Sequence, residues 1–208
     1  RMTRLAGKLG YRLGDDTDAT LSYIHVLDHL KQAGSLPLSL LHVDREANFT
    51  PGDFTDSNLN LVALNVRQKL PAGFSLAVNG FYRNNDQEGF VRGQTSESLL
   101  QTLLGSGGGI AQLTHEGAIL ARKNLATLGF EYTRNQFDIT NCGFFSVNQA
   151  LTTCNSSSFD FLTRQITKEH VIGAYLTDSF TLFEPFVLSA GFRYDWDNLN
   201  FTDKLDST

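Results

Sequence analysis

Hydrophobic and polar residues alternate along most of the chain, most clearly between Thr167 and Trp196. A break at residues 183–185 divides this stretch into two arms. In each arm, the residues that alternate with the apolar ones are mostly small, polar or charged. A period of two residues predicts β-strands, and so short a break predicts a tight turn. The apolar positions are Ile172, Ala174 and Leu176 in the first arm and Phe186, Leu188, Ala190, Phe192 and Tyr194 in the second. The stretch is therefore predicted to be a long antiparallel hairpin.

The arms of this hairpin are longer than the strands of soluble proteins, which usually have about 5–6 residues. A strand that crosses a membrane as part of a barrel needs about 9–11 residues, with one apolar face toward lipid and one polar face toward the interior. The hairpin has both features, so it predicts a transmembrane barrel.

The same alternation predicts six further strands, at residues 3–13, 17–28, 57–70, 74–83, 110–120 and 124–137. Short turns are expected at residues 14–16, 71–73 and 121–123. Longer connections are expected at 29–56, where LPLSLL is a candidate short helix, at 84–109 and at 138–165. Alternating short and long connections are typical of outer-membrane barrels, which have short periplasmic turns and longer extracellular loops.

The predicted fold is therefore an all-β, antiparallel transmembrane barrel segment of about eight long strands in up-and-down hairpins. With the short turns in the periplasm, the first and last strands both end on the extracellular side. A complete barrel is expected to begin and end on the other side. We therefore expect residues 1–208 to be part of a larger barrel.

Composition supports strands and disfavours several other classes of protein. The chain has 18 glycines and 16 phenylalanines but only 4 prolines, and its net charge is −5. The acidic balance disfavours a general nucleic-acid partner. No apolar run approaches the roughly 18 residues of a membrane helix, and no signal peptide is visible.

Cys142 and Cys154 lie in one segment rich in serine, threonine and asparagine. We expect a disulfide between them, and two unrelated thiols are the alternative. Closing such a loop contributes about 3 kcal/mol in the chain-entropy model. A disulfide also implies an oxidising compartment, such as a periplasm or cell surface.

Catalytic, metal and nucleotide sites are not indicated by the sequence. The glycine run at residues 105–109 lacks the lysine and serine or threonine of a phosphate-binding loop. His25 and His29 would lie about 13 Å apart along a strand, which is too far to share a metal ion. No serine, histidine and aspartate arrangement stands out, so we expect neither an enzyme nor a cofactor.

Several hairpins resemble those of TonB-dependent outer-membrane receptors. The stretch GAYLTDSFTLFEPFVLSAGFRYDW contains the sequence GFRYD at residues 191–195, which is similar to the glycine-x-arginine-tyrosine-aspartate strand of that family. LATLGFEYTRNQFD, LAGKLGYRLGDDTDATLSYIH and LNLVALNVRQKLPAGFSLAVNGFYRNN resemble other barrel strands and hairpins of these receptors. The resemblance spans nearly the whole chain.

This resemblance implies a barrel of about 22 strands with a plugged lumen. It also implies a plug domain and a TonB-contacting N-terminal segment, neither of which is in these residues. Such receptors bind a small molecule, often a ferric siderophore or similar metal chelate, and import it with energy relayed through TonB. The implied location is the outer membrane of a Gram-negative bacterium, with outer-membrane lipid as a partner.

Candidate ligand contacts are expected on the upper inner wall of the barrel or in its outer loops. Arginines there would meet an anionic chelate through charge-assisted hydrogen bonds, and an aromatic ring would stack on a planar ligand. The candidates are Arg83, Arg92, Arg134, Arg164 and Tyr132, with Phe144 and Phe145 as further aromatic candidates. The alternative for the arginines is solvation or pairing with nearby carboxylates, and the alternative for the aromatic residues is packing in an interface girdle or in a loop.

Two other functions fit the pattern. A passive porin or structural barrel would lack a plug domain, and the gene upstream of Arg1 would show this. A soluble extracellular β-sandwich that binds a ligand would stay in solution without detergent.

Overall fold

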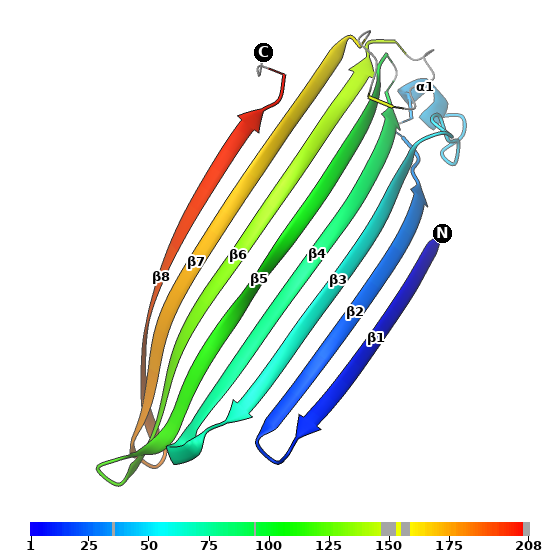
Figure 1. The fold of residues 1–208 in the computed structure, drawn as a ribbon. Coiled ribbons are helices and arrows are strands. Elements are labelled where there is room, and N and C mark those ends of the chain that lie inside the picture. Colours follow the sequence, from blue (N-terminus) through cyan, green and yellow to red (C-terminus); the bar gives the residue numbers. More distant parts are fainter. Residues whose placement is uncertain (35, 94, 147–152, 155–158, 206–208) are drawn as a thin grey trace.

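A single eight-stranded sheet makes up nearly all of the computed structural model, which describes residues 1–34, 36–93, 95–146, 153–154 and 159–205. Each strand pairs antiparallel with the next in chain order. The strands are β1 (Met2–Leu13), β2 (Thr17–Lys31), β3 (Phe54–Lys69), β4 (Phe74–Arg92), β5 (Glu97–Ile119), β6 (Arg122–Phe144), β7 (Phe161–Phe183) and β8 (Phe186–Asp203). Strands β1 and β8 lie at opposite edges and do not pair, so the sheet is open (Figure 1). This confirms the predicted up-and-down segment of a barrel.

Tight turns join the strands at one end of the sheet, called here the lower end (Figure 1). They lie at residues 14–16, at the 3₁₀ turn η1 (Pro71–Gly73), at residues 120–121 and at residues 184–185. The third turn was predicted at residues 121–123, but it is formed by Leu120 and Ala121, whose φ angles are 52° and 60°. Positive φ at both central residues gives a two-residue turn the twist that fits a hairpin, so Arg122 already belongs to β6.

The connections at the upper end are shorter than those predicted from the alternation of hydrophobic and polar residues. Residues 32–53 join β2 to β3 and contain α1 (Leu38–Leu41), the short helix expected in LPLSLL. Residues 145–160 join β6 to β7. The long segment predicted at 84–109 is wrong, because β4 continues to Arg92, β5 begins at Glu97, and only residues 93–96 lie between them.

The missed strand ends have a common physical cause. Residues 84–88 of β4 are polar on both faces of the sheet, and residues 105–109 of β5 are mainly glycine. Neither stretch shows an apolar period of two or a preference for strands. Backbone hydrogen bonds along a continuous antiparallel register keep both stretches extended nevertheless.

The sheet has no second layer over most of its length. The apolar side chains of the second arm of the predicted hairpin are exposed on β8, with Leu188 60% and Phe192 70% exposed. The buried hydrophobic residues of the described part are Phe90, Leu99, Cys142 and Cys154, all at the upper end. Among the residues that the structure describes, no helix is long and apolar enough to cross a membrane.

Candidate functional site

One face of the sheet is polar, and contacts that skip a strand identify it as the concave face. Tyr175 of β7 donates a hydrogen bond to Gln112 of β5 across β6, with 3.4 Å between Oη and Oε1. Arg193 of β8 reaches Glu131 of β6 across β7, with 3.0 Å between the nitrogen and the carboxylate oxygen. Side chains from strands two apart converge on the inner side of a curved sheet. We call this side the concave face and the other the convex face.

A row of polar side chains crosses the upper half of the concave face. Arg83, Ser106, Asn135 and Glu169 follow one another in register on β4, β5, β6 and β7. Ser106 donates a hydrogen bond to Asn135, and the Asn135 amide donates one to Glu169 at 2.6 Å. The row, called the concave row below, therefore has hydrogen-bonded groups in its middle and opposite charges at its ends.

Arg83 is the cationic end of the concave row. Its Nε atom is buried and has no hydrogen-bond partner among the described residues. A buried donor without a partner loses its hydration without compensation. The concave row therefore ends in a half-buried guanidinium whose Nε donor its neighbours do not satisfy.

The lower half of the convex face is an apolar band. Leu128 of β6 lies between Leu113 of β5 and Leu176 of β7 in the sheet register, and it is 55% exposed. On β4 the band runs from Phe74 to Tyr82, a length of nine residues that matches the requirement for crossing a bilayer.

Aromatic residues mark the upper limit of this apolar band. Tyr23 of β2 and Tyr82 of β4 lie on either side of Val62 in one register row. Tyr132 of β6 and Trp196 of β8 lie on either side of Ile172 in another. We call these four aromatic residues the upper aromatic row. Above it the convex face becomes polar.

A groove of about 680 Å³ lies on the convex face, where the aromatic row gives way to polar residues. Gly105 and Gly107 of β5 form the part of its floor that has no side chains, and Leu103 forms the rest. Its walls are Tyr82, Asn84 and Asp86 of β4 and Tyr132, Arg134, Gln136 and Asp138 of β6. This feature is called the β5 groove below.

A hydrogen-bonded pair stands at the upper end of the β5 groove. Gln101 of β5 donates a hydrogen bond to Glu88 of β4 at 2.7 Å. This pair is the next one above Asp86 and Leu103 on the same face of the two strands. At the lower end Tyr132 is anchored through its hydroxyl to Nδ1 of His170 at 3.0 Å.

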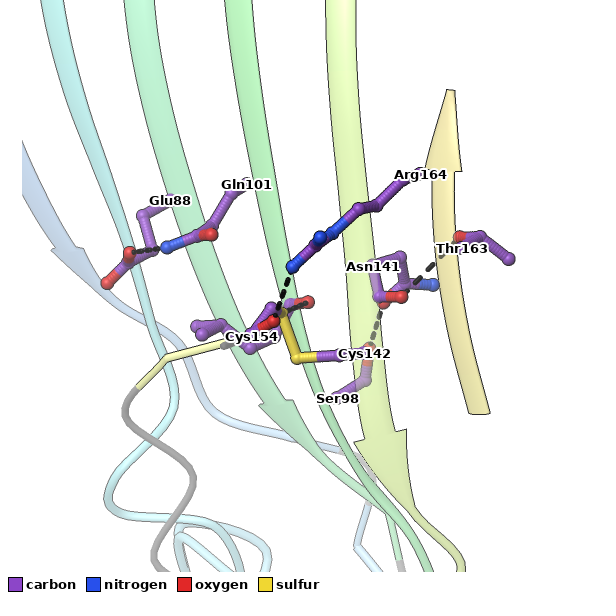
Figure 2. The surroundings of a disulfide bond; sticks show 9 residues. Glu88, Ser98, Gln101, Asn141, Cys142, Cys154, Thr163 and Arg164 are labelled. Carbon is purple, nitrogen blue, oxygen red and sulfur yellow. Dashed lines mark hydrogen bonds between the residues drawn. A yellow bond between two sulfur atoms is a disulfide. The ribbon is translucent and has the colours of Figure 1, made fainter. Parts of the chain in front are cut away.

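The disulfide expected from the sequence pair is present at the upper end of the sheet. Cys142 of β6 is bonded to Cys154, with the two Cα atoms 5.6 Å apart. Arg164 of β7 donates a hydrogen bond to the Cys154 carbonyl oxygen at 2.9 Å (Figure 2). Because both sulfur-bearing residues are buried beside Leu99, this part of the 145–160 connection is fixed to the sheet.

A buried carboxylate lies beside this cluster, at the start of β5. Glu97 is 1% exposed, and neither of its carboxylate oxygens has a hydrogen-bond partner among the described residues. The Arg92 guanidinium is 3.7 Å away. Burial raises the pKa of Glu97, and the attraction of Arg92 opposes that rise.

The structure separates the five residues that the sequence suggested as ligand contacts. Only Arg83 faces the concave side. Tyr132 and Arg134 line the β5 groove on the convex face. Arg92 pairs with Glu97 and stacks on Phe90, with 4.9 Å from guanidinium carbon to ring centroid. Arg164 binds the carbonyl oxygen of Cys154.

Three residues that share the concave row with Arg83 were not predicted from the sequence, namely Ser106, Asn135 and Glu169. The available signal was the alternation itself, because Asn135 and Glu169 lie on the polar parity of their strands. Ser106 gave no such signal, since it lies in a segment that was predicted to be a loop.

The histidines that the sequence singled out bind neighbouring side chains. His25 contacts the Asn60 side-chain oxygen at 2.9 Å through Nδ1, and His29 contacts Asp56. Both histidines lie on the convex face of β2, and Leu27 lies between them on that face.

Comparison with known families gives one match over nearly the whole chain. The family model described as "TonB dependent receptor-like, beta-barrel" matches residues 7–208. No curated protein sequence matches the chain.

Solved structures with the same fold include three receptors. The ferric citrate transporter FecA in its unliganded form superimposes with a TM-score of 0.85 at 15% identity, over 100% of this chain and 31% of that chain. The siderophore receptor PiuA from Acinetobacter baumannii gives 0.75 at 14% identity, over 100% and 36%. The alcaligin outer-membrane receptor FauA from Bordetella pertussis gives 0.69 at 16% identity, over 97% and 29%. The chain thus spans about a third of the length of these proteins.

Proposed function

The chain belongs to the TonB-dependent receptor-like β-barrel family, and on that premise we propose that it is part of an outer-membrane receptor that binds and imports a scarce nutrient. The proposed nutrient is a ferric siderophore or a similar metal chelate, and the proposed energy source is TonB. Three proteins with the same fold support this class of ligand, namely the ferric citrate transporter FecA, the siderophore receptor PiuA and the alcaligin receptor FauA. In this proposal the protein is a transporter and not an enzyme.

The two faces of the sheet define its orientation in the proposed membrane. The convex apolar band faces lipid, and the concave face lines the lumen. The tight turns at the lower end lie in the periplasm, and the cluster around Cys142 lies outside the cell. An oxidised disulfide fits an extracellular position. The strands missing from the sheet, the plug and the TonB-contacting segment belong in this proposal to other parts of the receptor.

Arg83 is the observation that carries the ligand proposal. It is the one candidate ligand contact from the sequence that faces the lumen, and its Nε donor has no partner among the described residues. Many ferric chelates are anions, and an arginine binds anionic oxygens through charge-assisted hydrogen bonds. Glu169 at the other end of the concave row repels an anion, so the ligand is expected on the Arg83 side.

Uptake of a radiolabelled ferric chelate tests this proposal in cells that depend on the complete receptor. Arg83→Gln should weaken binding about 10- to 150-fold, because a hydrogen bond to a charged group contributes about 1.5–3 kcal/mol. Arg122→Gln, at the lower end of β6, is the matched control and should bind as the wild type does. Equal binding by both variants and the wild type would remove Arg83 from the site. Absence of chelate uptake by the wild type in an energised cell would remove the transport proposal itself.

The proposed membrane orientation has a separate test. Leu128→Arg places a charge in the middle of the convex apolar band and should destabilise the folded receptor by about 2–4 kcal/mol. Thr127→Arg places the same charge one residue away on the concave face, where water solvates it, and should cost far less. The two variants are compared by urea unfolding in phospholipid vesicles. Equal costs would contradict the assignment of the faces.

A further inference from the structure

Charge is divided between the two halves of the concave face, β1–β4 and β5–β8 (Figure 1). In the described strands β1–β4, this face carries two acidic side chains, Asp18 and Asp28, and six basic ones, namely Arg4, Lys8, Arg12, Arg67, Lys69 and Arg83. In the described strands β5–β8, it carries two basic side chains, Lys123 and Arg193, and six acidic ones, namely Glu116, Glu131, Glu169, Asp195, Asp197 and Asp203. The sign of the charge at neutral pH therefore changes across the middle of the sheet.

The concave row crosses this boundary with one charge at each end. Arg83 on β4 and Glu169 on β7 are three strands apart in register, so their backbones are separated by about 14 Å. Between them, Ser106 donates a hydrogen bond to Asn135, which in turn donates one to Glu169. The row is thus a polar strip with a positive pole at Arg83 and a negative pole at Glu169.

The positive pole has no counterion within the sheet. On the concave face the nearest side chains to Arg83 are Leu61 and Ser106 in its own row and Phe81 and Asn85 on its own strand. None of these is a carboxylate. Among the described residues, the Arg83 guanidinium forms no hydrogen bond and no ion pair. An anionic partner would therefore meet no competing carboxylate beside Arg83.

The negative pole is satisfied only in part. One carboxylate oxygen of Glu169 accepts the hydrogen bond from the Asn135 amide at 2.6 Å, and the other forms no hydrogen bond among the described residues. On the concave face its neighbours on β8 are Leu199 in the same row and Asp197 in the row below, whereas Lys168 lies on the convex face. A surface with charges of one sign concentrates ions of the opposite sign, so this end of the row favours a cation.

We propose that the concave row binds a dipolar metal chelate, with the anionic metal-bearing part at Arg83 and a protonated amine of the same molecule at Glu169. This inference rests on the proposed function and narrows its ligand to chelates that carry a cationic arm. The guanidinium binds the anionic oxygens through charge-assisted hydrogen bonds, and the ammonium group donates to the free oxygen of Glu169. A chelate without the amine would meet only repulsion at Glu169.

Two synthetic ferric chelates test the inference. Both are built on citrate, with one carboxylate joined through an amide to a diaminoalkane arm. The arm ends in a free amine in the first chelate and in an acetylated amine in the second. Isothermal titration calorimetry measures the binding of each to the complete receptor in detergent. The wild type should bind the free amine about fivefold more tightly, which corresponds to about 1 kcal/mol for an ion pair with a half-buried carboxylate.

Glu169→Gln removes the negative charge, while the new amide oxygen can still accept the hydrogen bond from Asn135. This variant should bind the two chelates equally. Glu116→Gln is the matched control, because it removes the same charge from the concave face of β5 near the lower end of the sheet. It should keep the fivefold preference. Arg83→Gln should weaken the binding of both chelates and leave the preference in place.

Equal binding of the two chelates by the wild type would overturn the inference, and so would a preference that survives in Glu169→Gln. In either case, uptake of another ferric chelate by energised cells would still support the proposed function. A wild-type receptor that binds neither chelate and takes up no ferric chelate in such cells would instead overturn the proposed function, and the inference with it.

Discussion

At the residue scale, function depends on which face of a strand a side chain occupies. Arg134 and Asn135 are neighbours in the chain, yet Arg134 lines the convex groove while Asn135 bonds to Ser106 and Glu169 on the concave face. Because side chains alternate strictly along a strand, a candidate contact must be chosen by its parity as well as by its type. Arg83 and Arg134 are both arginines near the upper end, and only parity places them on opposite faces.

The pH response of Glu97 is a prediction at this scale. Burial raises its pKa above the ordinary value of 4.5, so the folded protein holds this proton more tightly than the unfolded chain does. The contribution to stability is therefore greatest below that value and is lost as the pH rises above it. Glu97→Gln should remove this loss and make the upper end of the β4–β5 hairpin more stable at neutral pH, because it replaces a buried carboxylate with a neutral group.

Hydrogen exchange of the backbone amides around Arg92 and Glu97, corrected for the intrinsic effect of pH, measures this difference in the complete receptor. The wild type should lose protection as the pH rises above the ordinary pKa of a glutamate, whereas Glu97→Gln should not. Parallel pH profiles for the two proteins would show that Glu97 does not control this end of the hairpin.

At the scale of elements, glycines on the concave face let side chains cross a neighbouring strand. Gly129 lies between Gln112 and Tyr175 in one register row, and the Tyr175 ring occupies the space that a Gly129 side chain would need. Gly173 of β7 has the same relation to Arg193, whose guanidinium nitrogen lies 2.9 Å from the position of an added Cβ. These contacts tie together strands that share no backbone hydrogen bonds.

Gly129→Val should therefore destabilise the sheet more than an ordinary glycine substitution. The new side chain displaces the Tyr175 ring and breaks its hydrogen bond to Gln112, at a cost of about 1–3 kcal/mol for overpacking. Gly10→Val is the control on the same face, because an added Cβ there meets no atom within 4 Å. Urea unfolding of the complete receptor measures the difference. Equal midpoints for the two variants would show that Tyr175 does not need a glycine at position 129 to cross β6.

At the scale of the whole molecule, the sheet has two open edges and no closed core. Strands β1 and β8 each have one unpaired side, and an exposed strand edge readily pairs with another chain. In the proposed receptor, further strands would remove both edges and make the concave face the wall of a lumen.

Residues 1–208 expressed alone should accordingly fail to form a stable monomeric barrel. The open edges of β1 and β8 should pair between molecules, so the refolded chain in detergent is expected to form oligomers or aggregates. Size-exclusion chromatography with light scattering checks this expectation. A monodisperse monomer with full strand content would show that the edges are protected in another way.

The sequence by itself determined the strands that carry an apolar period of two, the tight turns and the family. The hairpin around residues 184–185 and the apolar row of Leu188 and Phe192 were predicted correctly because a strand with one apolar face repeats every two residues. The alternation ended where both faces are polar, so the sequence could not show that β4 continues past Arg83 or that the glycine run at 105–109 is a strand.

Only the tertiary structure decided which polar residues meet. Register between strands far apart in the chain brings Arg83, Ser106, Asn135 and Glu169 into one row. The same register places Arg134 beside Tyr82 in a groove on the opposite face. The physical reason is that backbone hydrogen bonds set the register along the whole strand, whereas a single stretch of sequence specifies only the parity of its own side chains.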